Sequence, residues 1–296
     1  MRFTLLAVLF ATACSGSSTP TQAPSETAQG KAERLQIGSL EAFALDDGYI
    51  VEPNDGKAFV LGHTSEAAEV LAAAGLPSDK IRLDVQVLLV KAGDHVILFD
   101  TGAGAFIPTA GHLSKSLALA GVEPSAVTDI FISHTHGDHV GGLVTKAGAL
   151  AFPSATIHMS APEWATFRAD PDADAKRLVA AIEAKVSAFE PGAQVLPEVK
   201  AVATQGHTPG HSSYEVSSGD DKVFYLGDVA HHSVLSVQRP AWSIQFDHDH
   251  AAGEAMRQQT LAQLASDHTR VFAVHFPFRG VGHVVAEGQG LVWKPE

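Results

Sequence analysis

The sequence predicts an α/β fold in one domain, and three observations support this prediction. The 296 residues are 45% hydrophobic and only 18% charged, which is typical of a folded protein and excludes a disordered, collagen-like or disulfide-stapled chain. Strand and helix patterns alternate in two successive stretches, before and after about residue 150, and no short repeat interrupts them. Because alternating strands and helices pack in layers, we expect a layered α/β architecture.

The individual elements follow from local patterns of apolar residues. Two short strands, 84–90 and 95–99, are apolar enough to be buried on both faces, and the turn Lys91–Asp94 joins them. The segment 250–265 has helical spacing of apolar residues. In chain order, the other expected elements are a helix at 112–120, a strand at 129–133, a helix from about 140, a strand at 156–159, helices at 162–167 and 173–189, and strands at 201–204, 213–216, 223–226 and 271–274.

Charge and histidine content narrow the classes of function. The chain has 20 basic and 33 acidic residues, a formal net charge of −13, which repels nucleic acid and anionic lipid surfaces. We therefore expect a small-molecule substrate and no nucleic-acid partner. A chain of this length can bury a sufficient core without metals or disulfides, so its sixteen histidines need another explanation. The oligomeric state stays open, with a dimer among the options.

The N-terminus has the order of an export signal. Arg2 is followed by the apolar run Phe3–Phe10, three small residues and Cys14, which is the only cysteine of the chain. This resembles a bacterial lipoprotein signal, in which the cysteine carries the lipid; an ordinary signal peptide with a chance cysteine is the alternative. We expect a signal at 1–14, a flexible tether rich in Ser, Thr, Pro and Gln at 15–34, and the domain at 35–296, anchored by lipid in the bacterial envelope or periplasm.

The most informative segment is His134-Thr135-His136-Gly137-Asp138-His139, at the end of a predicted strand. Residues two apart in an extended segment point the same way, so His134 and His136 can bind one metal ion. Asp138 and His139 follow a glycine that permits a sharp turn, and they can bind a second ion. Imidazole and carboxylate together suit zinc, with iron, manganese or cobalt as alternatives.

This motif resembles the signature of the metallo-β-lactamase superfamily. The family pattern continues with a third histidine, an aspartate and a last histidine, each at a strand end. The turn Gly206–His211 resembles the first of these, with His207 as the ligand and His211 behind it. Leu226-Gly227-Asp228 resembles the family's bridging aspartate, and Val274-His275-Phe276-Pro277 supplies the last histidine.

The resemblance implies both a fold and a set of ligands. The fold is an αββα sandwich of two similar halves, with the metals at one edge. The first ion would be bound by His134, His136 and His207, and the second by Asp138, His139 and His275. Asp228 would bridge the two ions. Asp100, in Asp100-Thr101-Gly102, matches a family position whose carboxylate supports the ligand loop.

A ligand set for two such ions indicates metal-assisted hydrolysis. Ions about 3.5 to 4 Å apart can share a hydroxide, because a bound metal lowers the pKa of water to about 7, and they can also polarise a carbonyl or phosphoryl oxygen. Asp138 is placed to orient this hydroxide and to carry its proton. We therefore expect a dinuclear hydrolase that acts on an ester-like centre.

Further motifs resemble the methyl parathion hydrolase and acyl-homoserine lactonase-like branch. These are Asp100–Phe106, Gly141-Gly142-Leu143 and His275–His283. The resemblance implies a lactone as substrate, with a phosphotriester or carboxylic ester as alternatives. Candidates for contact with the substrate, or for support of the ligands, are the aromatic residues Phe106, Trp164, Phe167 and Phe276 and the histidines His231, His232 and His283.

Other functions of the same fold remain open from the sequence. A true β-lactamase of this superfamily generally lacks the bridging aspartate, and several use a cysteine at the second metal. A glyoxalase II-like thioesterase carries a helical extension, whereas only 21 residues follow His275. A persulfide dioxygenase binds a single iron, so a metal count separates it from a dinuclear hydrolase. A non-catalytic metal-binding lipoprotein is the last alternative.

Overall fold

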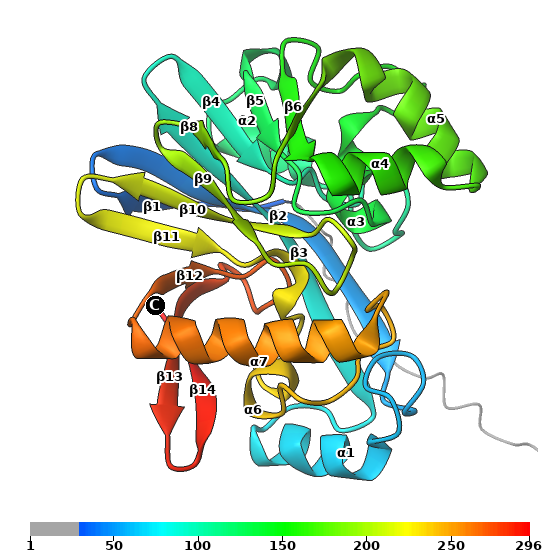
Figure 1. Ribbon diagram of the computed structural model, residues 1–296, viewed down its shortest axis with the longest axis vertical. Coiled ribbons are helices and arrows are strands. Elements are labelled where there is room, and N and C mark those ends of the chain that lie inside the picture. The colour runs from blue at the N-terminus through cyan, green and yellow to red at the C-terminus, as the bar shows by residue number, and fades with distance from the viewer. Residues whose placement is uncertain (1–29) are drawn as a thin grey trace, which may run out of the picture.

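A computed structural model describes residues 30–296, so the predicted signal and Cys14 lie outside the described residues. Two seven-stranded sheets face each other, with helices on both outer faces (Figure 1). The first sheet contains, in spatial order, β1 (Ala32–Ile37), β2 (Leu40–Pro53), β3 (Lys80–Ala92), β4 (His95–Phe99), β5 (Asp129–Phe131), β6 (Thr156–Ser160) and β7 (Val186–Phe189). The second contains β14 (Gly290–Pro295), β13 (Val281–Glu287), β12 (Arg270–Phe272), β11 (Asp221–Tyr225), β10 (Ser212–Ser218), β9 (Val199–Ala203) and β8 (Gln194–Leu196).

The helices lie on the outer faces of the two sheets. Figure 1 shows α2, α3, α4 and α5 on the side of the first sheet, and α1, α6 and α7 on the side of the second. Their bounds are α1 Thr64–Ala73, α2 Leu113–Leu119, α3 Gly137–Val140, α4 Ala161–Ala169, α5 Ala173–Ile182, α6 Leu235–Gln238 and α7 His250–Ser266. Short 3₁₀ turns are η1 Pro124–Ala126, η2 Gly141–Leu143, η3 Glu183–Lys185 and η4 Gly227–Val229. No helix among residues 30–296 is long and apolar enough to cross a membrane.

Three of the four apolar clusters among the described residues join the sheets to each other and to α2, α4, α5 and α7. The middle cluster lies between the two sheets and includes Leu88, Phe99, Tyr214 and Tyr225, all fully buried. A second cluster joins the first sheet to α2, α4 and α5, and a third joins the second sheet to α7, through residues such as Leu261. The expected αββα sandwich is therefore confirmed.

Two boundaries differ from the sequence prediction. The helix expected at 173–189 ends at Ile182, and Val186–Phe189 forms β7, because these residues pair in parallel with β6 from Ile157 onward. Strand β1 begins at Ala32 and pairs with β2, so residues 32–34, which the sequence assigned to the tether, belong to the first sheet. The remaining predicted elements lie within a few residues of observed ones, while β2, α1, β8, α6, β13 and β14, like β1, were not predicted.

Parallel pairing places several loops at the same edge of the sandwich. Strands β4, β5, β6 and β7 are parallel neighbours in the first sheet, and β11 and β12 are parallel in the second. The carboxyl ends of parallel strands meet at one edge of a sheet, which is where ligands bind in such folds. The loops after β4, β5, β11 and β12, together with the loop after β9, carry the residues described next.

Candidate metal centre

The histidine motif begins directly after β5. His134 follows the strand by three residues, His136 precedes the first residue of α3, and α3 itself carries Asp138 and His139. The other candidate ligands come from the second sheet. His207 lies in the loop after β9, Asp228 in η4 after β11, and His275 in the loop after β12. Residues more than 100 positions apart in the sequence therefore meet at one edge of the sandwich.

The seven candidate ligands form two adjacent groups, each able to hold a metal ion. One group is His134, His136, His207 and Asp228, and the other is Asp138, His139 and His275; in each, the potential ligand atoms lie within 4.8 Å of one another. The histidines and Asp138 divide as the resemblance to the superfamily implies, and Asp228, which the resemblance places between the two ions, falls in the first group.

The carboxylate of Asp228 lies between the two groups. Its Oδ2 is 3.6 Å from His134 Nε2 and 3.4 Å from His207 Nε2. Its Oδ1 is 3.3 Å from His139 Nε2 and 3.2 Å from His275 Nε2. Each oxygen thus faces one group, which is the arrangement that a bridging carboxylate needs.

Two of the ligand atoms are buried without a hydrogen-bond partner. They are Nε2 of His134 and Oδ1 of Asp228. A buried polar atom without a partner is costly, so these atoms fit a site that is completed by a cation. Burial also holds the pKa of His134 and His207 well below the usual histidine value, and neutral imidazole is the form that binds metal.

The second group lies in a more negative environment. Burial alone would lower the pKa of His139, but Asp228, Asp138 and Asp100 raise it well above its usual value. The pKa of His275 is raised in the same way, against burial, chiefly by Asp228. Three carboxylates around these imidazoles favour a positive charge at this position, and a divalent ion would supply it.

Asp100 and His211 contact candidate ligands, which agrees with the positions that the resemblance to the superfamily implies for them. Asp100 is fully buried at the end of β4 and accepts hydrogen bonds from His139 Nδ1 (2.7 Å), from the hydroxyl of Tyr225 (2.7 Å) and from Ser133. Nε2 of His211 accepts the backbone N–H of Asp228 (2.9 Å). Such partners fix the orientation and tautomer of metal ligands.

The sequence did not indicate two further buried acids. Glu163 accepts hydrogen bonds from the backbone and hydroxyl of Thr135, from the hydroxyl of Thr208 and from the backbone of Gly210, so it joins the loops of the two sheets. The segment Ser160-Ala161-Pro162-Glu163 fits a capping-box pattern, in which the Glu163 side chain would accept a hydrogen bond from the backbone at the start of its own helix. Its carboxylate points instead toward the site.

The second acid is Asp247, which is fully buried beside His207. It accepts a hydrogen bond from Nδ1 of His207 (2.9 Å) and another from Nη2 of Arg257 (3.0 Å). Arg257 is itself buried in α7 and also donates to the backbone carbonyls of Pro240 and Trp242. No spacing in the sequence indicates this chain of contacts, because its members come from a loop and a helix that the site motifs do not include.

The aromatic candidates divide into core and surface residues. Phe167 and Phe276 are buried in the outer core clusters, so the expectation that they contact substrate is wrong; packing against apolar neighbours explains both. Trp164 packs partly against the same cluster as Phe167 and lies beneath Arg168. Phe106 is 42% exposed, and its ring rests against the backbone of Gly137 and Gly141 in and after α3.

The histidine candidates also differ in position. His231 is buried, with its Nε2 3.2 Å from Asp228 Oδ2 and its ring 4.8 Å from that of His207. His232 is buried too, and its Nδ1 accepts the backbone N–H groups of Val234 and Leu235. His283 lies in β13 opposite Arg270 and makes none of the ring or ion-pair contacts that join the cluster.

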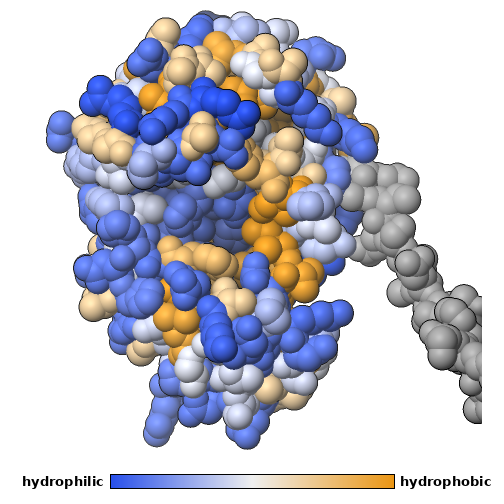
Figure 2. Space-filling view, turned by 90° about the vertical axis from the view of Figure 1, so that its right-hand side faces the viewer, coloured by the Kyte–Doolittle hydropathy of each residue, from blue (hydrophilic) through white to orange (hydrophobic). Residues whose placement is uncertain are grey.

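One side of the metal cluster is open. His134, His139, His207, Asp228 and His275 are buried, whereas residues 135–138 are partly exposed. Figure 2 shows a hollow at mid-height on this side of the molecule, with polar residues at its floor and apolar residues along one wall. The open side of the cluster therefore lies at the N-terminus of α3.

Comparison with known proteins identifies the fold family. The sequence pattern of the metallo-beta-lactamase superfamily matches residues 81–275, about two thirds of the chain. The chain belongs to the metallo-beta-lactamase superfamily. It is similar to the solved structure of AidC, a dizinc quorum-quenching lactonase in complex with the product N-hexanoyl-L-homoserine, at 32% identity and a TM-score of 0.85, over 90% of this chain and 98% of that one.

Other members of the superfamily are also similar. The hydrolase AbOPH is 27% identical with a TM-score of 0.82, over 90% of this chain and 97% of that one. Among curated proteins, ribonuclease Z of Pyrococcus furiosus is 30% identical over 82 residues, 27% of this chain. The chain spans about a quarter of the length of the ribonucleases Z that it matches. Family and site together make this superfamily member a metal-dependent hydrolase.

Proposed function

We propose that the site binds two divalent ions, most simply zinc. His134, His136 and His207 would hold the first ion, and Asp138, His139 and His275 the second, with Asp228 between them. The two ligand groups, the position of each Asp228 oxygen and the unpartnered buried atoms support this proposal. Histidine and carboxylate ligands suit zinc, and they also suit iron, manganese and cobalt.

We propose further that the protein hydrolyses a lactone. One observation carries this proposal: the likeness to the dizinc lactonase AidC extends over 90% of this chain and 98% of that one, at 32% identity. The match to ribonuclease Z is much shorter. The net charge of −13 also opposes binding of a polyanionic RNA.

When bound, two ions would lower the pKa of a water molecule and polarise the lactone carbonyl. The protein's own part begins with Asp138, whose side chain is only partly buried beside the open side of the site. Its carboxylate can orient the attacking water and accept its proton. The acyl carbon–oxygen bond of the ring then breaks, and the ring oxygen takes this proton to leave as a hydroxyl group. The product is a hydroxy acid, so atoms and charges balance.

The surrounding residues keep this geometry fixed. Asp100 fixes His139, His211 fixes the backbone of Asp228, and Asp247 fixes His207. Preorganised ligands of this kind need no rearrangement during the reaction, which is the main source of catalytic power in electrostatic catalysis.

The proposal is tested by removing ligands. His136→Ala and Asp228→Ala each delete one candidate ligand, so we expect both bound metal and lactone hydrolysis to be lost. His250→Ala, an exposed histidine at the start of α7, is the matched control and keeps both. The assay panel contains an N-acyl-homoserine lactone, an aryl phosphotriester, a glutathione thioester and a cephalosporin. Full activity of either ligand variant, or preference for the thioester or cephalosporin, would contradict the proposal.

We also propose that the protein is exported and anchored by lipid at Cys14. The order of basic, apolar and small residues before this cysteine supports the proposal. Cells that express the full chain should incorporate labelled palmitate into the protein, and Cys14→Ser should abolish the label. An unlabelled protein cleaved at another residue would show an ordinary signal peptide instead.

A further inference from the structure

The carboxylate of Glu163 links a loop of the first sheet to a loop of the second. Its Oε1 accepts the backbone N–H of Thr135 at 2.8 Å and the hydroxyl of the same residue at 2.7 Å. Its Oε2 accepts the hydroxyl of Thr208 at 2.7 Å and the backbone N–H of Gly210 at 3.1 Å. Glu163 is only 1% exposed. A buried carboxylate is costly unless polar groups satisfy it, and these four donors do so.

Each of the two linked loops carries ligands of the first metal position. Thr135 lies between His134 and His136 in the loop after β5. Thr208 directly follows His207 in the loop after β9. The loops meet at these histidines, where Nε2 of His207 lies 3.0 Å from Nδ1 of His136. The second group of ligands comes from α3 and the loop after β12, and the four hydrogen bonds to Glu163 lie outside both segments.

The start of α4 also holds the turn after His207 by close packing. A Cβ at Gly210 would lie 2.1 Å from the backbone nitrogen of Glu163, so this turn rests directly on the first turn of the helix. The hydroxyl of Ser160 donates to the carbonyl of Gly210 at 2.6 Å and accepts the N–H of Glu163 at 3.2 Å. Ser160 is both the last residue of β6 and the N-cap of α4. The position of Glu163 is therefore set by the first sheet.

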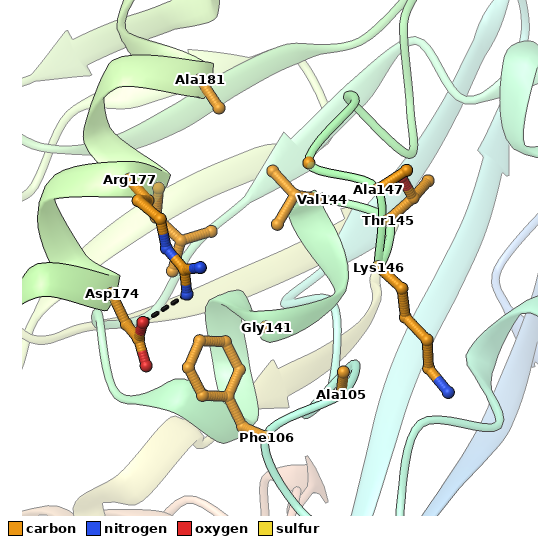
Figure 3. A pocket seen from close by; sticks show the side chains of 12 residues that line it. Ala105, Phe106, Gly141, Val144, Thr145, Lys146, Ala147, Asp174, Arg177 and Ala181 are labelled. Carbon is orange, nitrogen blue, oxygen red and sulfur yellow. Dashed lines mark hydrogen bonds and ion pairs between the residues drawn. The ribbon is translucent and has the colours of Figure 1, made fainter.

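Glu163 is not part of the open space beside α5. A cavity of about 470 Å³ lies between α5 and the segment 144–148, and Figure 3 shows Arg177 and Asp174 paired among its lining residues. None of the twelve residues that line this cavity is Glu163 or one of its hydrogen-bond partners. Since its side chain is also buried, Glu163 can act on a reaction only through the loops that it holds.

From this arrangement we propose that Glu163 is a positioning residue for the first metal ion. It fixes the loops after β5 and β9 against each other, so that the three histidines of the first group keep the geometry of a bound ion. The inference rests on the proposed dinuclear site. Glutamine cannot replace the carboxylate, because it has one accepting oxygen and one donating NH₂ group. In either orientation of the amide, the backbone N–H of Thr135 or that of Gly210 faces the NH₂ group and loses its acceptor.

The test changes the hydrogen bonds without changing the size of the side chain. Glu163→Gln removes one accepting oxygen, and Glu183→Gln makes the same change at an exposed residue directly after α5 as the matched control. Calorimetry of zinc added to the chelated protein measures the affinity of each ion. We expect Glu163→Gln to weaken one of the two ions about tenfold, the lower end of the effect of partners behind metal ligands, and the other less than about twofold. The control should leave both affinities unchanged.

A spectrum separates positioning of the ligands from general support of the fold. The visible spectrum of the cobalt-loaded protein reports ligand geometry, and it should change in Glu163→Gln but not in Glu183→Gln. Thr208→Val removes a single donor and should weaken the same ion to a smaller extent. If Glu163→Gln does not fold, an unchanged zinc affinity of Thr208→Val decides against the inference.

Two results would overturn the role of Glu163. One is a lower melting temperature of Glu163→Gln with unchanged zinc affinity and an unchanged cobalt spectrum, because the residue would then support the fold alone. The other is equal weakening of both ions. Zinc affinity is measured without turnover, so two bound zinc ions without any lactone hydrolysis would contradict the proposed lactonase function and leave the role of Glu163 intact.

Discussion

Replacement of Asp247 by Asn tests how the first metal position is held. Asp247 is fully buried, and its two oxygens accept from His207 Nδ1 at 2.9 Å and from Arg257 Nη2 at 3.0 Å. Asparagine has one accepting oxygen and one donating nitrogen. In either orientation, its NH₂ group faces a donor. If it faces His207, the ring must carry its proton on Nε2, the atom that would bind metal.

The size of the effect follows from these contacts. Loss of a hydrogen-bond partner behind a metal-bound histidine typically weakens metal affinity 10- to 100-fold, about 1.4 to 2.7 kcal/mol at 1.36 kcal/mol per tenfold change. Arg257 also loses its buried counter-charge, and a broken buried ion pair costs about 3 to 5 kcal/mol of stability. The melting temperature should therefore fall together with metal affinity.

Native mass spectrometry across a series of chelator concentrations counts the ions on each chain. We expect Asp247→Asn to retain one ion at chelator concentrations where the unchanged protein retains two, since the contacts of the second group stay intact. Asp220→Asn changes the same type of residue at an exposed turn and should behave like the unchanged protein. If Asp247→Asn released both ions together, or neither, Asp247 would not have the proposed role.

Three further predictions concern stability and the hydrogen bonds behind the site. Burial raises the pKa of Asp129, but hydrogen bonds from His158, His95 and Thr128 outweigh it and lower the pKa to about 2 from 3.8. The ionised carboxylate therefore stabilises the fold above about pH 4, and this contribution is lost toward pH 2. In urea titrations, the unchanged protein should exceed Asp129→Asn in unfolding free energy by about 1 to 2 kcal/mol near neutral pH, and this difference should shrink between pH 4 and pH 2. Gly142→Ala should lower the melting temperature markedly, because its Cβ would lie 2.0 Å from the carbonyl oxygen of Thr101. An unchanged melting temperature would show that the backbone at Thr101 can move away without cost. Tyr225→Phe removes a hydrogen bond to Asp100 and should cost about 1 to 3 kcal/mol of stability, measured by denaturant unfolding at constant metal content, and a stability gain would contradict the assigned bond.

The ligands could be predicted from the sequence because they lie at short spacing or directly after apolar strands. His134, His136, Asp138 and His139 occupy six consecutive positions, and Asp228 and His275 each follow a strand with a clear apolar pattern. Strand ends that meet at one sheet edge bring such residues together whatever their separation in the chain. The spacing alone separated His134 and His136 from Asp138 and His139, and the resemblance to the superfamily implied the places of His207, Asp228 and His275.

The supporting residues could not be predicted, for a physical reason. Glu163 and Asp247 act through tertiary contacts, and the local pattern around each indicates something else: a helix cap for Glu163 and a polar loop for Asp247. The sequence neighbours of His231 likewise do not reveal that this candidate lies buried against Asp228. For Phe167 and Phe276, an aromatic ring near a ligand motif could not be distinguished from one in the core.

A metal titration tests directly whether a dinuclear site opens a lactone. Metal is added to the chelated protein, and the metal content per chain and the rate of hydrolysis of N-hexanoyl-homoserine lactone are measured at each step. We expect the rate to reach its maximum at two ions per chain, with His134, His136, His207, Asp138, His139, Asp228 and His275 as the ligands. Maximal activity at one ion per chain, or no lactone hydrolysis at two, would contradict this expectation.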